Sequence, residues 1–324
     1  MSPFATRLST LTRWETALAV ALIVAVFFDA SLLPSPADVW TWSDATFYFT
    51  ERAVVALPLA LLIIAGEIDV SVAGIIALAS VAMGLAAAHG IDTPGLAAIG
   101  IGTGLGAGAV NGALVTLCRV PSIVATIGTM TLFRGCAYAI LGERVLKDYP
   151  ASFAVFGQGY AFGPVSVELC VLAVLSIIAA VTLHYTRPGY LIYAMGANAV
   201  AARCSGVRVA RYRFALFCAV GAMSGLAAVM LTSRLGSTRP SIAQGWELEI
   251  ISIVVLGGVA INGGKGTIGG VVLAAVLLGL VNFGLGLLNV PGIVMWVVIG
   301  ALLITVVAIP SLADSWRQRR VGVT

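Results

Sequence analysis

The stretch RPGYLIYAMGANAVAARCSGVRVARYR, residues 187–213, separates two long apolar segments of the chain. It carries five of the 18 Lys and Arg residues and no acidic residue. A basic loop between two membrane spans is typical of the cytoplasmic side. Residues 197–203 favour a short helix, which Asn198 would cap and Gly206 would end. The stretch therefore predicts a membrane protein that presents a short helix to a soluble partner.

The composition of the whole chain agrees with a membrane protein. Hydrophobic residues make up 60% of it and charged residues 10%, whereas a soluble domain carries about 25% charged residues. The net charge of +4 does not indicate a nucleic-acid partner, because the basic residues lie in loops between apolar runs. We therefore predict an all-α polytopic protein, a single transmembrane domain over residues 1–324.

Composition also argues against a metal site or catalytic centre. The five cysteines form no C-x-x-C pair, and His89 and His184 lie far apart in the sequence. Neither a disulfide framework nor a metal-ligand spacing is visible. No catalytic residue and no metal ligand is predicted.

Apolar runs predict ten transmembrane helices. The first is interpreted as an uncleaved span rather than a signal peptide, because no small-x-small cleavage site follows it. Asp29, which interrupts the apolar run, is a second reason for this interpretation. The predicted spans are residues 17–28, 52–66, 70–88, 94–117, 122–141, 164–185, 214–233, 249–262, 267–288 and 292–311.

Ten spans place both termini on one side of the membrane, and the basic residues indicate which side. One set of loops holds Arg7, Arg13, Arg119, Arg187, Arg203, Arg208, Arg211, Arg213, Lys265, Arg317, Arg319 and Arg320. The other set holds Arg52, Arg144, Lys147, Arg234 and Arg239. The richer set is expected in the cytoplasm, together with both termini.

Glycines suggest close helix packing rather than nucleotide binding. Gly100, Gly104 and Gly108 lie four residues apart, a spacing that lets membrane helices approach closely. The run GGKGT at 263–267 departs from the phosphate-loop pattern at two positions and is interpreted as a tight turn. Residues 263–280 weakly resemble residues 66–85, since both begin with glycines and continue as a helix of small residues. Transporters often contain such repeats with broken helices.

Five polar residues near or within spans are candidates for a transport or structural role. Glu67, Asp69 and Ser71 lie between two spans, where acids are costly and tend to be functional. Capping of the next helix by Asp69 or Ser71 is the preferred interpretation, and it is compatible with a transport role. Asn111 lies within a span and favours an interhelical hydrogen bond. Arg134 lies deep in a span, where a charge costs about 2.5–3.5 kcal/mol.

Arg134 is therefore expected to face protein or water and to bind an acid or backbone carbonyls. Glu67, Asp69 and Glu168 are the candidate acids. If the span is shifted by a few residues, Arg134 would instead extend to the membrane surface. Trp246, Glu247 and Glu249, with Arg234 and Arg239, could form a polar outer surface or an ordinary solvated loop.

Four stretches resemble the permease subunits of bacterial ABC sugar importers, the ribose, arabinose, autoinducer-2 and rhamnose group. They are GEIDVSVAGIIALAS (66–80), PSIVATIGTMTLFRG (121–135), YAMGANAVAARCSGV (193–207) and VVLGGVAINGGKGTIGG (254–270). The first motif usually begins Gly-Gly and here begins Gly66-Glu67. SDATFYFTERA (43–53) and SRLGSTRPSIAQGWELE (233–249) are most similar to the rhamnose members.

The resemblance implies a permease subunit in the bacterial inner membrane that carries a monosaccharide. It implies a cytoplasmic ATPase that binds ATP and Mg²⁺, a periplasmic sugar-binding protein, and a second permease subunit, identical or related. No cofactor is expected in this chain. Membrane lipid is expected to surround it. The resemblance also makes 187–213 a cytoplasmic coupling loop whose contact residues would be Asn198, Ala201, Ala202, Arg203 and Gly206.

Two other classes of protein remain as alternatives. An ion-coupled secondary transporter would use intramembrane acids, of which Glu67, Asp69 and Glu168 are the candidates. A membrane-embedded enzyme would need a constellation such as paired histidines, and the two isolated histidines make it the weaker interpretation.

Overall fold

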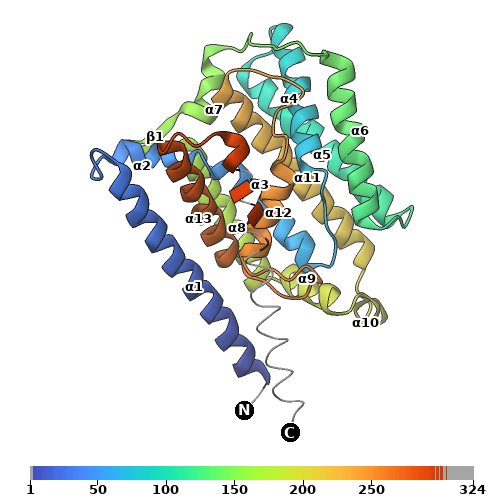
Figure 1. Ribbon diagram of the computed structural model, residues 1–324. Helices are drawn as coiled ribbons and strands as arrows, with labels where there is room; N and C mark the ends of the chain where they lie inside the picture. Colours follow the sequence, from blue (N-terminus) through green and yellow to red (C-terminus); the bar gives the residue numbers. More distant parts are fainter. Residues whose placement is uncertain (1–2, 296, 299, 302–303, 305–324) are drawn as a thin grey trace.

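The computed structural model describes residues 3–295, 297, 298, 300, 301 and 304, and the side chains from Trp14 onward. The chain forms a bundle of helices with one short hairpin (Figure 1). The elements are α1 Pro3–Leu32, α2 Val39–Thr46, α3 Thr50–Ile64, α4 Val72–Ala88, α5 Thr93–Thr116, α6 Ser122–Leu141, η1 Ala151–Ala154, α7 Val155–Gln158, β1 Tyr160–Phe162, β2 Val165–Ser166, α8 Val167–Tyr185, α9 Arg187–Ala197, α10 Ala199–Cys204, α11 Val209–Leu235, α12 Trp246–Leu256 and α13 Ile268–Leu287.

Six helices in the described part of the chain are long and apolar enough to cross a membrane: α1 from Trp14, α5, α6, α8, α11 and α13. The pair α2 and α3, bent by 45°, would be a seventh span. The apolar helix α4 has 17 residues and α12 has 11, which is short for a crossing of about 20. The protein is therefore a polytopic helical membrane protein, and the count of ten stays a prediction.

Individual predicted spans agree with the helices to different degrees. Residues 94–117 and 122–141 correspond closely to α5 and α6. The span predicted at 249–262 is wrong in its bounds, because α12 begins earlier, at Trp246, and ends at Leu256. Asp29 does not interrupt the first helix, which continues to Leu32 with Asp29 buried. The span predicted at 292–311 lies largely outside the described residues.

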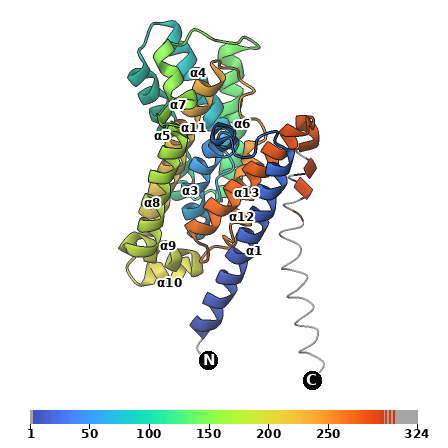
Figure 2. The same ribbon diagram turned by 90° about the vertical axis from the view of Figure 1, so that its left-hand side faces the viewer.

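The helix α3 lies in the centre of the bundle. Fourteen of its 15 residues are buried, and from Ala53 to Ile64 it is apolar on every side, as is typical of a helix enclosed by other helices. Long helices pack around it: α8, α11 and α13 contact it, and α1 lies along the outer side of α13 (Figure 2). The centre of the core is therefore one buried helix rather than a cavity.

Glycines bring α5 and α11 into backbone contact. A Cβ added to Gly104 would lie 2.7 Å from the backbone nitrogen of Gly225, and one added to Gly108 would lie 2.9 Å from the Cα of Gly221. Such spacing lets two membrane helices approach closely. The predicted packing role is confirmed for this row of glycines. The neighbouring row, Gly102 and Gly106, faces open space.

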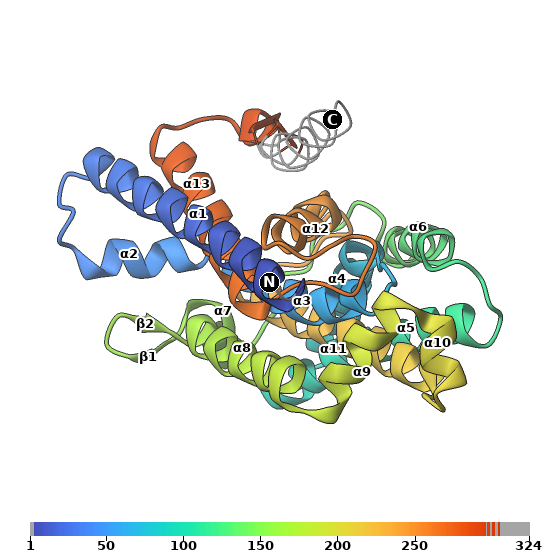
Figure 3. The same cartoon turned by 90° about the horizontal axis from the view of Figure 1, so that it is seen from below.

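The bundle has two dissimilar ends. At one end lie α9 and α10, which run across the ends of the other helices (Figures 1 and 3). At the opposite end lie α2, η1, α7 and the antiparallel hairpin of β1 and β2. We call these the α9–α10 end and the hairpin end.

Acid–arginine pairs fill the interior near the hairpin end. Arg234 binds Glu51 through two hydrogen bonds of 2.8 and 2.9 Å. Arg52 lies 2.6 Å from Glu249 and above the ring of Trp246. Glu249 and Trp246 are buried, so the predicted polar outer surface is wrong for these two residues: they pack inward.

Candidate functional site

The short helix expected in the basic stretch is present as α10, joined to α9 by Asn198. Its carboxamide oxygen accepts hydrogen bonds from the backbone N–H groups of Val200 and Ala201, both at 3.0 Å. These bonds satisfy N–H groups that have no partner within the helix. Gly206 follows the helix with φ +85°, a left-handed conformation that favours glycine. Both the cap and the terminator were predicted from the sequence.

The α10 helix exposes one side and buries the other. Ala201, Arg203 and Gly206 are exposed, as a contact surface requires, and Val200 is 68% exposed. Ala202 is only 6% exposed and belongs to the protein's own core. The prediction that Ala202 contacts a partner is therefore wrong, because its methyl group faces inward. Val200 is an exposed apolar residue of the same helix and was not among the predicted contacts.

Backbone contacts fix the end of α9 to two loops of the bundle. A Cβ added to Gly196 would collide with the carbonyl oxygen of Ile64 and with the nitrogen of Gly264. The N–H of Gly264 donates to that same Ile64 oxygen at 2.8 Å. The loop before α4 and the loop before α13 thus meet α9 at one point. These contacts connect α9 to both loops without an intervening segment.

Tyr193 adds a side-chain contact to this junction. Its hydroxyl donates a 2.6 Å hydrogen bond to the carbonyl oxygen of Gly266. Burial raises the pKa of Tyr193 to about 12, so the hydroxyl keeps its proton at neutral pH. The turn at 263–267 was predicted, and Gly263 and Gly264 have φ of +81° and +73° there. The attachment of that turn to α9 was not predicted.

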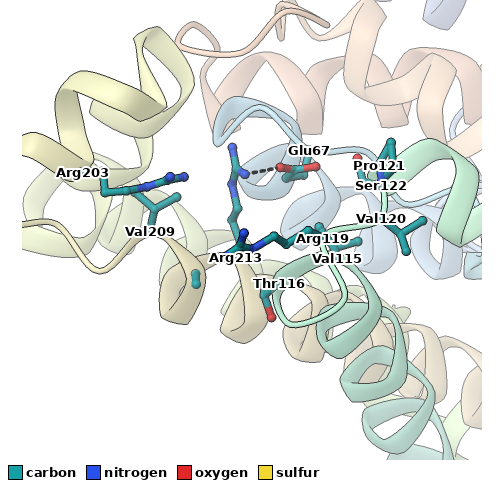
Figure 4. Close-up of a pocket in the computed structure, with 11 residues that line it drawn as sticks. Glu67, Val115, Thr116, Arg119, Val120, Pro121, Ser122, Arg203, Val209 and Arg213 are labelled. Atoms are coloured by element: carbon teal, nitrogen blue, oxygen red, sulfur yellow. Dashed lines mark ion pairs between the residues drawn. The ribbon is translucent and has the colours of Figure 1, made fainter.

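A cavity of about 520 Å³ opens at the same end, between the loop before α4, the α5–α6 turn and the start of α11 (Figure 4). Glu67 and Arg213 form an ion pair of 2.7 Å across it. Arg119 and Arg203 also line the cavity. Three arginines face one acid, so the cavity attracts anionic groups. Glu67 and Arg203, singled out separately from the sequence, are thus brought together.

Asp69, Ser71 and Asn111 form a second, fully buried cluster. One oxygen of Asp69 accepts hydrogen bonds from the N–H and the hydroxyl of Ser71, at 2.8 and 2.6 Å. The Asn111 amide donates to Asp69 at 3.2 Å and to Ser71 at 2.7 Å. The interhelical hydrogen bond predicted for Asn111 is confirmed. Capping was predicted for Asp69 or Ser71. Ser71 occupies the N-cap position of α4 and accepts no capping bond, whereas Asp69 accepts the N–H of Ser71 itself.

Arg134 binds backbone carbonyls rather than an acid. It donates to the carbonyl oxygens of Pro240 and Ile242, at 2.8 and 2.6 Å, and to that of Ala73 at 3.1 Å. The carbonyl alternative is confirmed, and the three proposed acids have other surroundings. Arg134 lies on α6 and joins the segment before α12 to the first turn of α4. It is not part of the arginine-rich cavity.

Within the described residues, no group of three or more His, Cys, Asp or Glu side chains could hold a metal ion. The geometry instead defines a class: a polytopic membrane protein whose capped, exposed α10 helix is fixed to two loops that enter the bundle.

Comparison with known proteins makes that class specific. The family described as "Branched-chain amino acid transport system / permease component" matches residues 43–307. The chain belongs to this permease family.

Three relatives show similarity over most of the chain. An autoinducer 2 import system permease of Photorhabdus temperata is 32% identical over 322 residues, 95% of this chain and 96% of the relative. The ribose import permease of Bacillus subtilis (strain 168) is 36% identical over 259 residues, 79% of this chain and 80% of the relative. That of Escherichia coli (strain K12) is 33% identical over 277 residues, 84% of this chain and 85% of the relative. The protein is a permease of the bacterial inner membrane.

Proposed function

We propose that this chain is the membrane-spanning permease subunit of an ATP-driven importer of a monosaccharide or a similar small sugar. The observation that carries the proposal is α10, a capped and exposed helix whose attachment to the bundle runs through backbone contacts. Relatives named as ribose and autoinducer 2 import permeases supply the substrate class. In this proposal α10 docks on a cytoplasmic ATPase, and α9 transmits the ATPase movement to the loops before α4 and α13.

The proposal places the α9–α10 end, and both termini of a ten-span chain, in the cytoplasm. Basic residues of the described loops support this orientation. The α9–α10 end carries Arg119, Arg187, Arg203, Arg208, Arg211, Arg213 and Lys265. The hairpin end carries five basic residues, Arg52, Arg144, Lys147, Arg234 and Arg239, and the orientation follows the richer end. Reporter fusions within 187–213 should give a cytoplasmic signal and fusions within 142–163 a periplasmic one, and the reverse would contradict the orientation.

The remaining subunits follow from the same proposal. The ATPase binds ATP and Mg²⁺, a periplasmic binding protein delivers the sugar, and a second permease, identical or related, completes the pathway. Rhamnose is the proposed substrate because of residues 43–53 and 233–249, and ribose is the substrate in the names of two relatives.

An ion-coupled secondary transporter is the alternative, and Glu168 is the observation in its favour. Glu168 is fully buried at the start of α8, and neither of its carboxylate oxygens has a hydrogen-bond partner. The other two acids considered have partners. Glu67 pairs with Arg213, and Asp69 accepts hydrogen bonds from Ser71 and Asn111. Of the three acids considered, Glu168 alone lacks a partner, and it is a smaller basis than the family and α10 together.

Uptake into membrane vesicles separates the two proposals. Vesicles from cells that express the chain with its neighbouring genes would be loaded with ATP and offered labelled D-ribose and L-rhamnose together with the binding protein. We expect uptake that requires ATP and continues when a protonophore collapses the proton gradient. Uptake without ATP that the protonophore abolishes would overturn the importer and favour Glu168 as an ion-coupling acid.

A further inference from the structure

A second cavity opens on the side of the bundle, between α6 and the segment that leads into α12. Its volume is about 370 Å³, within the range of small-molecule sites. Five polar side chains line it: Thr131, Arg134 and Tyr138 from α6, with Gln244 and Glu247. None of these residues lies near α10, so the cavity is separate from the surface assigned to the ATPase.

The depth of this cavity follows from the packing of α6. A Cβ added to Gly74, in the first turn of α4, would lie 2.7 Å from the carbonyl oxygen of Met130. Met130 is the ninth of the 20 residues of α6, so α4 begins beside the middle of the crossing. The cavity extends from Met130 to Tyr138, from the middle of α6 toward the hairpin end.

The segment before α12 reaches the same depth. With 11 residues, α12 is about 16 Å long at 1.5 Å per residue, roughly half of a 30 Å hydrocarbon layer. The carbonyls of Pro240 and Ile242 bind Arg134, which holds this irregular backbone against α6. Irregular backbone at membrane depth is tolerated where it lines a water-filled space or is buried in protein.

The lining of the cavity is incompatible with lipid. Thr131, Gly135 and Gln244 are exposed on the surface of the chain, and Glu247 and Arg134 are charged groups beside them. Charged and amide groups at this depth face water or protein. Gly128 and Gly135 leave open space on the same helix, and small residues allow another helix to approach closely. A second permease subunit is therefore the natural wall of the open side.

The chemistry of the lining suits an uncharged ligand. One guanidinium and one carboxylate balance each other, and the other three groups are a hydroxyl, a phenol and an amide. Such groups donate and accept hydrogen bonds without selecting a charge. The arginine-rich cavity at the α9–α10 end, by contrast, has an excess of positive charge.

We propose that Thr131, Tyr138, Gln244 and Glu247 form half of a site that contacts a neutral, polyhydroxylated solute during transport, with a second permease subunit closing the open side. Arg134 is a positioning residue here, because its bonds to carbonyls hold the segment that carries Gln244. The inference rests on the proposed function for its substrate class. The predicted water-filled space can be tested without knowledge of the sugar.

Cysteine accessibility tests whether the cavity holds water. The five native cysteines would first be replaced by serine, since Cys136 is exposed on α6. Thr131→Cys and Gln244→Cys would then be treated with a charged, membrane-impermeant thiol reagent in the assembled complex. Leu132→Cys is the matched control, because Leu132 is the next residue of α6 and is 57% exposed. We expect labelling at 131 and 244 to be at least tenfold faster than at 132, and equal rates would overturn the proposal.

Sugar preference tests the contact itself. Tyr138→Phe, Gln244→Ala and Glu247→Gln would be compared with Glu143→Gln, an exposed acid at the hairpin end outside the cavity. We expect the ratio of D-ribose to L-rhamnose uptake to shift at least threefold in the cavity variants and to stay constant in the control. A purely structural role would scale both rates alike and would overturn the sugar contact. Absence of uptake of either sugar by the unmodified complex would instead contradict the proposed function, whatever the labelling shows.

Discussion

At the scale of single residues, Arg134 shows how a charge is accommodated inside a helical bundle. The sequence predicts that a charge deep in a span needs partners. It does not reveal them, because they are carbonyl oxygens of two distant segments, Ala73 in one and Pro240 and Ile242 in the other. Backbone acceptors leave no trace in a pattern of residue types. The same limit applies to Ala202, whose inward orientation depends on how α10 lies against the core.

Replacement of Arg134 by Leu should destabilise the protein. The change leaves the carbonyls of Pro240 and Ile242 without their charged donor, and hydrogen bonds to charged groups contribute about 1.5–3 kcal/mol each. We expect a loss of at least about 3 kcal/mol, seen as a lower unfolding temperature in detergent and early aggregation.

The matched control for Arg134 lies on the same helix. Arg144 also donates to carbonyls, those of Leu141 and Ile140, but near the exposed end of α6. Arg144→Leu should change the unfolding temperature little. Equal effects of the two substitutions would show that the depth of Arg134 and its bonds to a distant segment have no special importance.

At the scale of elements, the helices that the sequence predicts best are those whose pattern is complete within one stretch. The α10 helix is such a case, because its cap, its alanines and its terminating glycine are contiguous. The bend of 45° between α2 and α3 and the short α12 are the opposite case. The ends of α12 coincide with Gly245, which has φ +87°, and with Gly257 and Gly258, the latter with φ +84°, and a hydropathy pattern gives no weight to such glycines.

Packing of α5 against α11 gives a prediction with an internal control. In Gly104→Ala the new methyl group would meet the backbone of α11, with Gly225 nitrogen at 2.7 Å. Forcing the helices apart should cost about 1–3 kcal/mol. Gly102→Ala adds the same group where nothing lies within 4 Å, and alanine favours helices over glycine. Unfolding in detergent should show a lower transition temperature for Gly104→Ala and an unchanged or higher one for Gly102→Ala. Identical shifts in the two variants would contradict the close packing of α5 and α11.

Docking of α10 is best tested with bulk at Ala201. A tryptophan at Gly206 would confuse two effects, since φ of +85° strains any side chain there by about 1–2 kcal/mol. Ala201 is exposed and has helical backbone, so Ala201→Trp adds bulk without strain. We expect normal expression and loss of the co-purifying ATPase.

Two controls accompany the Ala201 variant. Gly206→Ala measures strain without bulk, and Ala161→Trp adds the same bulk to the hairpin at the opposite end, where Ala161 is also exposed. The ATPase should remain bound in Ala161→Trp. Retention of the ATPase by Ala201→Trp as well would mean that this face of α10 is not the docking surface.

At the scale of the whole molecule, the two ends of the bundle differ in what they offer a partner. The α9–α10 end presents an exposed helix, an arginine-rich cavity and backbone contacts to two loops. The hairpin end presents the β1–β2 hairpin above an interior of paired charges. Composition predicts the membrane class, and the distribution of basic residues predicts the orientation. The connection of α9 to both loops emerges only from the folded chain.

The most direct test of the account is to identify the protein that contacts α10 in the cell. A photo-reactive benzoylphenylalanine would replace Val200, which is 68% exposed on α10, or Phe162, which is 78% exposed on the hairpin. After illumination of intact cells, the cross-linked proteins would be identified by mass spectrometry. Position 200 should capture a nucleotide-binding ATPase subunit, and position 162 should not. Capture of that ATPase from position 162, or of a periplasmic protein from position 200, would contradict it.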